Sequence, residues 1–237
     1  MDREYVIVKS PPLFPRDSEV LRQLDSGFWQ SYIFYHFLKF YKDHNIEELK
    51  IKIKIESEKP ISNIEKLIAK YIRKYLRSNR DFNLHFDVNG ESETDTDIVG
   101  FYDIKISNTY WRENDKKKYF PFECKNLTLD SKKNHIAEYV FVNYKKDGGV
   151  YRYFNGKYAQ KQNFGGMLGF VLEGEVDIIK DKIIERLKLP FETTPQGDLI
   201  ADGILLNSIE DNNFTFNSIH KRFDGDFTLH HMLFDFK

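Results

Sequence analysis

The sequence contains very little cysteine and no long uninterrupted apolar run. Its single cysteine, Cys124, excludes a disulfide within the chain and a Cys-x-x-Cys metal site. No apolar stretch approaches the length of a membrane span and no basic, apolar leader opens the chain, so we expect a cytoplasmic protein without membrane contact. The 36 Lys and Arg residues are balanced by 37 Asp and Glu, a formal net charge of −1. Any contact with nucleic acid must therefore depend on local basic patches.

The chain does contain enough apolar and aromatic material for a sizeable core. Hydrophobic residues make up 41% of the 237 positions, and aromatic residues make up 16%. This length fits one large domain, or a core with a substantial extension. We expect residues 1–60 to form an N-terminal extension that packs on a core of residues 61–237, so that the two make one compact unit.

Two different periodicities occur in the extension. Over residues 17–44, apolar side chains recur at three- and four-residue steps, which predicts helix, with a division near Gly27. This stretch is rich in aromatic residues, and burial in a core is favoured over a surface for a partner protein. The strict alternation of Leu49-Lys-Ile-Lys-Ile-Lys-Ile55 predicts a half-buried strand.

After Pro60 the pattern is that of an amphipathic helix, capped by Ser62 or Asn63. Another face of this helix carries cations that are candidates for contact with a phosphate backbone: Lys66, Lys70, Arg73, Lys74 and Arg77. Residues 82–88 then alternate between apolar and polar, which predicts the first strand of a sheet.

The next two predicted strands carry the charges around which the chain is organised. Residues 97–107 and 119–125 are rich in β-forming residues. Because side chains alternate along a strand, Glu123 and Lys125 share one face, while Cys124 points into the core. Charges at the edge of a core are costly unless they are paired or bound to a metal ion, so this pair indicates a functional site.

The partner of Glu123 on the neighbouring strand follows from the register of the hairpin. The polar segment 108–118 suits a hairpin loop, and in an antiparallel pair the two facing residue numbers have a constant sum. Asp97 with Glu123 gives a sum of 220 and Asp103 with Glu123 gives 226, and both place the turn inside this loop. Either aspartate can therefore face Glu123. We favour Asp97, because the apolar pair Ile98-Val99 follows it directly.

An aspartate that begins one strand and a Glu-x-Lys motif that ends the next resemble the PD-(D/E)XK nuclease superfamily. The matching residues are Asp97, Glu123 and Lys125, and Thr96 stands where the family name has proline. The resemblance implies an α/β fold with a restriction-endonuclease-like αβββαβ core. It also implies an endonuclease that hydrolyses phosphodiester bonds with Mg²⁺ or Mn²⁺ ions. From the residues alone we expect a helical N-terminal extension before this core and a C-terminal β-hairpin.

The resemblance also implies a role for each matching residue. Asp97 and Glu123 would bind the metal ion together with the Cys124 backbone carbonyl, and Glu65 in the preceding helix is a further candidate ligand. Oxygen ligands of this kind suit Mg²⁺. Lys125 would hold or deprotonate the attacking water, or stabilise the charge that develops on the phosphate.

Further helices are predicted around residues 135–143 and 174–189, and residues 165–171 form a buried strand or a glycine-tolerant helix. The tail alternates on both sides of Asp224-Gly225, which predicts an antiparallel hairpin. Several segments carry candidate contacts to nucleic acid. In full these are Lys70, Arg73, Lys74, Arg77, Lys132, Lys133, Arg152, Lys157, Tyr158, His220 and Arg222.

The sequence thus predicts a divalent-metal-dependent nuclease that acts on DNA, with RNA left open. The resemblance further implies a component of bacterial anti-phage defence. The alternative is a catalytically silent nuclease-like fold that serves as a nucleic-acid-binding or assembly module with a partner protein, and a homo-oligomer is also left open. A carbohydrate or nucleotide hydrolase ranks last, because the chain has no Gly-rich phosphate loop and no paired-carboxylate motif.

Overall fold

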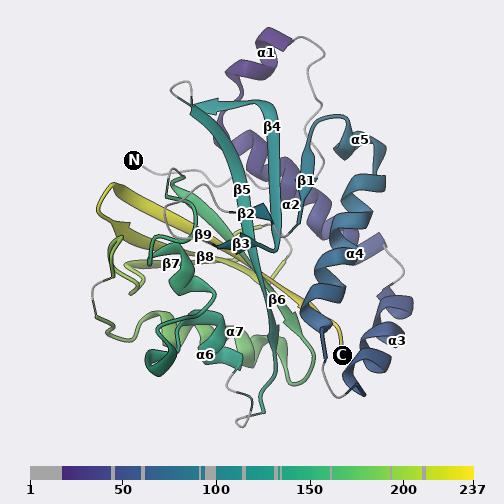
Figure 1. Ribbon diagram of the computed structural model, residues 1–237, viewed down its shortest axis with the longest axis vertical. Helices are drawn as coiled ribbons and strands as arrows, with labels where there is room; N and C mark the ends of the chain where they lie inside the picture. Colours follow the sequence, from purple (N-terminus) through teal and green to yellow (C-terminus); the bar gives the residue numbers. More distant parts are fainter. Residues whose placement is uncertain are drawn as a thin grey trace.

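The protein folds around one mixed β-sheet that lies between two layers of helices (Figure 1). The computed structural model describes residues 18–43, 46–59, 62–90, 92–93, 100–113, 116–130, 133, 135–160, 162–192, 194–209 and 212–237. The combination of this sheet with helices makes the chain an α/β protein, as the sequence predicts.

The main sheet has seven strands, of which most neighbours are antiparallel. In spatial order they are β1 (Asp87–Asn89), β4 (Ile104–Glu113), β5 (Lys116–Leu127), β6 (Phe164–Val171), β9 (Gly225–Asp235), β8 (Thr215–Arg222) and β7 (Gly203–Leu206). The pairs β5–β6 and β6–β9 are parallel, and the other four pairs are antiparallel. A separate two-stranded sheet contains β2 (Ser92–Glu93) and β3 (Phe101–Tyr102).

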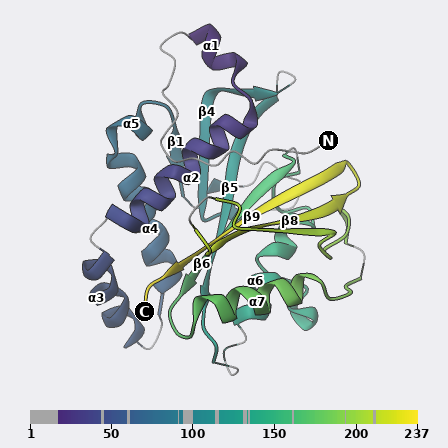
Figure 2. The ribbon, with the colours of Figure 1, turned by 180° about the vertical axis from the view of Figure 1, so that it is seen from behind.

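Helices cover both faces of the main sheet (Figures 1 and 2). One face is covered by α1 (Ser18–Gln23), α2 (Ser26–Asp43), α3 (Ile46–Ser57), α4 (Ile64–Ser78) and α5 (Arg80–Asn83). The other face is covered by α6 (His135–Val140), the 3-10 helix η2 (Val150–Tyr153) and α7 (Val176–Leu187), with η1 (Asn143–Lys145) between α6 and η2 in the chain. None of the described helices has the length and hydrophobicity that a membrane span requires.

The strand β5 separates two apolar cores, and its side chains alternate between them. Phe120, Phe122 and Cys124 belong to the core beneath α2 and α4, whereas Tyr119 and Leu127 belong to the core beneath α6 and α7. This period of two is the normal geometry of a strand with both faces covered. It places every odd-numbered side chain from Tyr119 to Leu127 on the α6 face of the sheet.

The predicted helical region of the extension is confirmed, although its division lies earlier than Gly27. The chain breaks at Leu24-Asp25, where the Asp25 carboxylate accepts a hydrogen bond from the Phe28 backbone N–H at 2.8 Å and so caps α2. The aromatic side chains of α2 pack into the sheet core, and Trp29 and Phe37 are fully buried. Burial rather than a docking surface therefore explains the aromatic content of α2, and the extension shares its core with the sheet.

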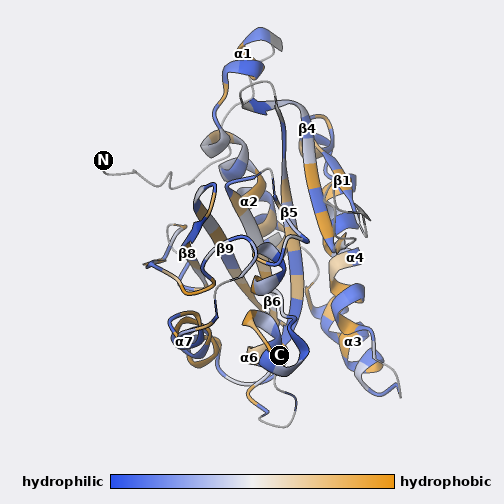
Figure 3. Ribbon diagram, turned by 60° about the vertical axis from the view of Figure 1, so that its left-hand side comes forward, coloured by the Kyte–Doolittle hydropathy of each residue, from blue (hydrophilic) through white to orange (hydrophobic). Residues whose placement is uncertain are grey.

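The predicted strand over residues 49–55 is wrong, because this segment is the helix α3. Only Leu49 and Ile53 are buried, four residues apart, while Ile51 is 62% exposed. The alternation of the sequence is visible along α3 in Figure 3, yet just one face of the helix contacts the core. An i,i+4 ion pair between Glu48 and Lys52 supports the helical form.

Two other boundaries differ from the prediction. Residues 82–88 were expected as one strand, but Phe82 lies in the helix α5. The Asn79 side chain caps this helix by accepting a hydrogen bond from the Phe82 backbone N–H at 3.1 Å. Strand β1 begins only at Asp87. The segment 108–118 is mostly strand rather than loop, because β4 continues to Glu113 and β5 begins at Lys116. The two strands pair along this extension too, after a shift of register between Ser107 and Arg112.

The predicted strand over residues 97–107 is divided at Asp103, with β3 before it in the small sheet and β4 after it in the main sheet. The predicted helices are confirmed as α4, α6 and α7, and the C-terminal hairpin β8–β9 turns where Arg222 pairs with Gly225. The glycine-rich run 165–171 is the strand β6 and not a helix. Close packing explains its glycines, since a Cβ atom on Gly166 would lie 2.3 Å from the ring of Phe122. The smaller residue lets β5 and β6 pair side by side.

Candidate functional site

The Glu-x-Lys motif lies in the middle of the molecule, on the α6 face of β5. Glu123 and Lys125 point the same way, and their side chains meet at 2.6 Å between Oε1 and Nζ. Glu123 and Cys124 are both fully buried, and Cys124 faces the opposite core. The orientation that the strand pattern predicts for these three residues is therefore confirmed.

The register of the hairpin brings Asp103 to this motif. Ile104 pairs with Phe122, a sum of 226, which is the register of the alternative that was not favoured. Asp103 lies directly before β4, and its Oδ2 accepts a hydrogen bond from the Cys124 backbone N–H at 2.7 Å. Asp97, the favoured aspartate, lies outside the described residues. Among the residues that the structure describes, Asp103 is thus the aspartate beside Glu123.

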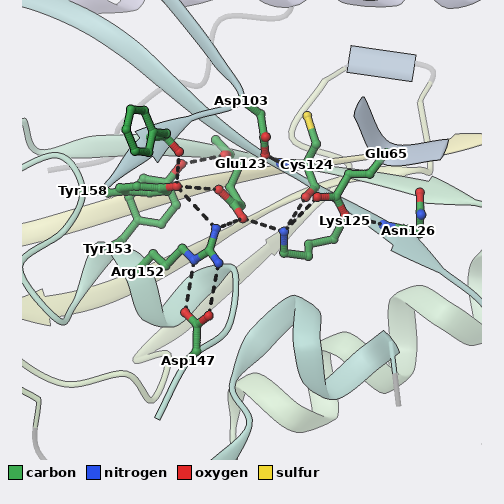
Figure 4. Close-up of polar contacts among 12 residues, drawn as sticks. Glu65, Asp103, Glu123, Cys124, Lys125, Asn126, Asp147, Arg152, Tyr153 and Tyr158 are labelled. Carbon is green, nitrogen blue, oxygen red and sulfur yellow. Dashed lines mark hydrogen bonds and ion pairs between the residues drawn. The ribbon is translucent and has the colours of Figure 1, made fainter. Parts of the chain in front are cut away.

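Three donors surround the carboxylate of Glu123 (Figure 4). The ammonium of Lys125 and the guanidinium Nη1 of Arg152 both lie 2.6 Å from Oε1. The hydroxyl of Tyr158 lies 2.8 Å from Oε2 and also contacts the carbonyl of Phe101. Arg152 comes from η2, so the segment after α6 closes over the motif.

Lys125 connects the motif to the first turn of α4. Its ammonium lies 3.2 Å from Oε1 of Glu65 and 2.8 Å from the Cys124 carbonyl oxygen. The other Glu65 oxygen accepts a hydrogen bond from the Asn126 backbone N–H at 3.3 Å. Two of the predicted ligands, Glu65 and the Cys124 carbonyl, therefore lie at the site, and both contact Lys125.

Burial and mutual repulsion shift the proton affinities of these groups. Burial, followed by the charge of Glu123, raises the pKa of Asp103 to about 7. Burial also raises the pKa of Glu65, although Lys125 acts against it. For the Lys125 ammonium, burial would lower the pKa, but the charges of Glu123 and Glu65 outweigh this effect and raise it. Lys125 is therefore a cation at neutral pH, while Asp103 can hold a proton.

Acidic groups slightly outnumber cationic groups around the motif. The carboxylates of Glu65, Glu123 and Asp147 pair with Lys125 or Arg152, and the charge of Lys157 also acts on Asp147. Asp103 adds a fourth carboxyl group, which can hold a proton. Within the described residues no three His, Cys, Asp or Glu side chains converge into a complete metal site. Mg²⁺ often uses only one or two carboxylates and keeps several waters, so the donor set fits it.

The basic face of α4 is only partly available to a ligand. The Arg73 guanidinium donates to the Asp103 carbonyl at 2.7 Å, and the Arg77 guanidinium donates to the Val88 carbonyl at 2.7 and 2.9 Å. These two predicted phosphate contacts hold α4 against β1 and the start of β4. The predicted contacts Lys70 and Lys74 are exposed on the same helix.

Two predicted contacts in the C-terminal hairpin are not on the surface. His220 is fully buried and hydrogen-bonded to Ser218 at 2.7 Å. Arg222 is 5% exposed and donates to the Ala159 carbonyl at 2.9 Å. The segment after η2 covers this strand, with Phe154 against His220 and the Ala159 carbonyl on Arg222. Neither side chain can reach an external phosphate in this structure.

The other predicted contacts lie around the site or beyond the described part. Arg152 and Tyr158, which were predicted as contacts to nucleic acid, contact Glu123 directly. Lys157 is partly buried, and Lys133 is exposed. Lys132 lies outside the described residues.

A groove of about 770 Å³ runs from the end of β5 along α3. Asn126 lines it, next to Lys125 and Glu65, and the Asn126 Oδ1 atom is buried without a partner among the described residues. The cationic side chains in its lining are Lys50, Lys54, Lys133 and Lys237, against the carboxylates of Glu47 and Glu173, while burial lowers the pKa of His135. The groove thus joins the charged cluster to a mainly basic surface.

One important site residue was missed by the sequence analysis. Asp147 accepts from the Nε and Nη2 atoms of Arg152 at 3.1 Å each, in a bidentate pair. The sequence offers no signal for this contact, because it depends on the turn at Gly148, whose φ is 156°, and on the placement of η2.

Comparison with known proteins gives no family for the chain. No protein-family model, curated protein or solved structure matches it. A function can therefore be argued only from the motif and from the geometry of its surroundings.

Proposed function

We propose that the protein is a divalent-metal-dependent nuclease that hydrolyses phosphodiester bonds in DNA. The observation that carries the proposal is the convergence of Asp103, directly before β4, with Glu123 and Lys125 of the adjacent strand β5, and with Glu65 of α4 beside them. This is the residue combination of the PD-(D/E)XK superfamily, with Asp103 in the place of the first aspartate. Two acids and a lysine in a largely buried position have no evident structural purpose, because apolar side chains would pack there without the free-energy cost of removing charges from water.

The order of the surrounding elements supports the same proposal. The helix α4 precedes the antiparallel strands β1, β4 and β5, and α6 then leads to β6, which is parallel to β5. An αβββαβ core of this kind is what the resemblance implies. The strands β7, β8 and β9 extend the sheet on the far side of β6.

In this proposal Asp103 and Glu123 would hold the cation. Such an ion lowers the pKa of a bound water and neutralises charge on the scissile phosphate. The Lys125 ammonium stays charged because Glu123 and Glu65 raise its pKa, so it suits electrostatic stabilisation of the phosphate or orientation of the water rather than proton removal. Glu65 and the Cys124 carbonyl hold this ammonium in place.

The groove beside Asn126 supports a polyanionic substrate. It carries more cationic than anionic side chains and begins next to the Lys125–Glu65 pair. Lys70 and Lys74 on α4 offer further exposed cations. Contacts of lysine with phosphate are independent of base sequence and weaken as salt concentration rises.

The test is cleavage of supercoiled plasmid by the purified protein in Mg²⁺ or Mn²⁺. Wild-type protein is expected to nick or linearise the plasmid, and chelation of the metal should stop it. Glu123→Gln should abolish cleavage, and Lys125→Ala should slow it roughly a hundredfold or more. Glu192→Gln is the matched control, because the Glu192 carboxylate is exposed, pairs with Lys146 and should leave the rate unchanged. Equal cleavage by wild type and Glu123→Gln would refute the proposal.

A second candidate is a catalytically silent module that binds nucleic acid. Both oxygens of Glu123 already have donors, and no complete metal site is formed within the described residues. For such a module, plasmid would remain intact in every metal, and duplex binding would be the same for wild type, Glu123→Gln and Lys125→Ala. The variant Lys70→Glu/Lys74→Glu should then weaken binding, which fluorescence anisotropy with a labelled duplex would measure.

A further inference from the structure

Arg152 lies between two carboxylates at the rim of the site (Figure 4). Its Nη1 atom is 2.6 Å from Glu123 Oε1, and its Nε and Nη2 atoms are each 3.1 Å from the oxygens of Asp147. The Arg152 side chain is 27% exposed, whereas that of Glu123 is completely buried. Arg152 therefore lies between the buried Glu123 carboxylate and the solvent.

The contact with Arg152 competes with a metal ion for the same oxygen. Oε1 of Glu123 is already within 2.6 Å of the Lys125 ammonium, so two cationic groups share it. A divalent cation held by Asp103 and Glu123 would lie next to the guanidinium, and like charges so close in a buried site repel strongly. Either Arg152 moves away or the ion binds weakly.

Glu123 would not be left without partners if Arg152 moved away. The Tyr158 hydroxyl would still hold Oε2, and the Lys125 ammonium would still hold Oε1. Asp147 would remain paired through the other edge of the guanidinium, since it does not use the Nη1 atom. A rotation about this bidentate pair would remove Nη1 from Oε1, which the Lys125 ammonium would continue to contact.

A phosphate offers Arg152 an alternative partner. Guanidinium groups bind phosphate oxygens through charge-assisted hydrogen bonds, and the planar fork suits two parallel bonds. A nucleic-acid phosphate at the site would lie on the exposed side of Arg152, opposite the buried Glu123.

From these contacts, and resting on the proposed function, we propose that Arg152 couples binding of the metal ion to binding of the substrate phosphate. In the free protein Arg152 neutralises Glu123 and weakens cation binding. When a phosphate is bound, Arg152 pairs with it, and the cation takes the place of the guanidinium beside Oε1 of Glu123. Metal and nucleic acid then bind with positive cooperativity, and the free protein holds little metal.

The test measures Mn²⁺ binding to the protein in the absence of nucleic acid, by the loss of the electron paramagnetic resonance signal of free Mn²⁺. Arg152→Gln is expected to bind Mn²⁺ about tenfold more tightly than wild type, a typical size for such coupling. Arg112→Gln removes an exposed arginine at the far end of β4 and should leave the affinity unchanged. If Arg152→Gln does not fold, Arg152→Lys replaces it, with a smaller gain because one ammonium cannot hold both carboxylates.

A second readout is the affinity for a labelled DNA duplex, measured by fluorescence anisotropy with EDTA or with Ca²⁺. Ca²⁺ should strengthen duplex binding by wild type and have less effect on Arg152→Gln, since the coupling is reciprocal. Equal Mn²⁺ affinities for wild type and Arg152→Gln would overturn the proposed coupling but would not contradict the proposed nuclease function. No Mn²⁺ binding to either protein, with or without duplex, would overturn both the coupling and the proposed function.

Discussion

Glu123 is a carboxylate without solvent exposure, so its partners must come from the side chains around it. An isolated buried charge is very costly, and removal of one partner from a buried ion pair typically costs several kcal/mol. Here two cations and one hydroxyl share the two oxygens. The hydroxyl of Tyr158 is the partner that can be removed without a change of charge.

We expect Tyr158→Phe to lower the free energy of unfolding by about 1–3 kcal/mol, because Oε2 of Glu123 would lose its buried donor. Urea unfolding followed by circular dichroism would measure the change. Tyr144→Phe is the matched control, since the Tyr144 side chain is 78% exposed and its loss of a hydroxyl should have almost no effect. Equal stabilities of the two variants would contradict the hydrogen bond to Glu123.

At the scale of elements, the parts that could be predicted from sequence depend on local periodicity. The alternation that separates Glu123 and Lys125 from Cys124 is a property of one strand, and the stripe of α4 is a property of one helix. The hairpin β8–β9 follows from its Asp-Gly turn. Each of these signals lies within about a dozen residues of sequence.

The parts that could not be predicted depend on packing between distant segments. The choice between Asp97 and Asp103 required the position at which β4 begins, and the approach of Arg152 to Glu123 required the placement of η2. The strict alternation of α3 is compatible with a strand or with a helix, because residues at i and i+4 also lie on one face of a helix. Only the core beneath α3 distinguishes Ile53 from Ile51.

Two substitutions in α3 test its helical form. Ile53→Ala should lower the free energy of unfolding by about 2–4 kcal/mol, because it removes buried methyl groups and leaves a cavity. Ile51→Ala should change it by less than about 0.5 kcal/mol, because Ile51 is exposed. In a strand both residues would share one face, so equal costs in thermal or urea unfolding would contradict the helix.

At the scale of the whole molecule, buried histidines make the fold sensitive to acid. Burial lowers the pKa of His36 to about 4, of His220 to about 4 and of His230 to about 3. A histidine whose pKa is lowered in the folded state stabilises the protein above its unfolded pKa of about 6.5. This contribution is lost as the pH falls from 6.5 towards the folded value, since the unfolded chain then binds more protons.

His36→Phe should therefore reduce the acid sensitivity. Both ring nitrogens of His36 are buried without a partner among the described residues, and Tyr32 and Phe82 pack against the ring. The variant should be at least as stable as wild type at pH 7. Between pH 6.5 and 4 its stability should fall less steeply, by up to about 1.4 kcal/mol per pH unit. Urea midpoints across this range would measure the difference, and parallel pH profiles would contradict it.

The position of β9 determines when the fold can be completed during synthesis. Residues 225–235 pair with β6 on one side and with β8 on the other, so β6 has an open edge until they leave the ribosome. An exposed hydrophobic strand edge invites pairing with other chains. A nascent chain that pauses before residue 225 would therefore expose the unpaired edge of β6, which is prone to aggregation. We expect chaperone binding to matter most at this stage of synthesis.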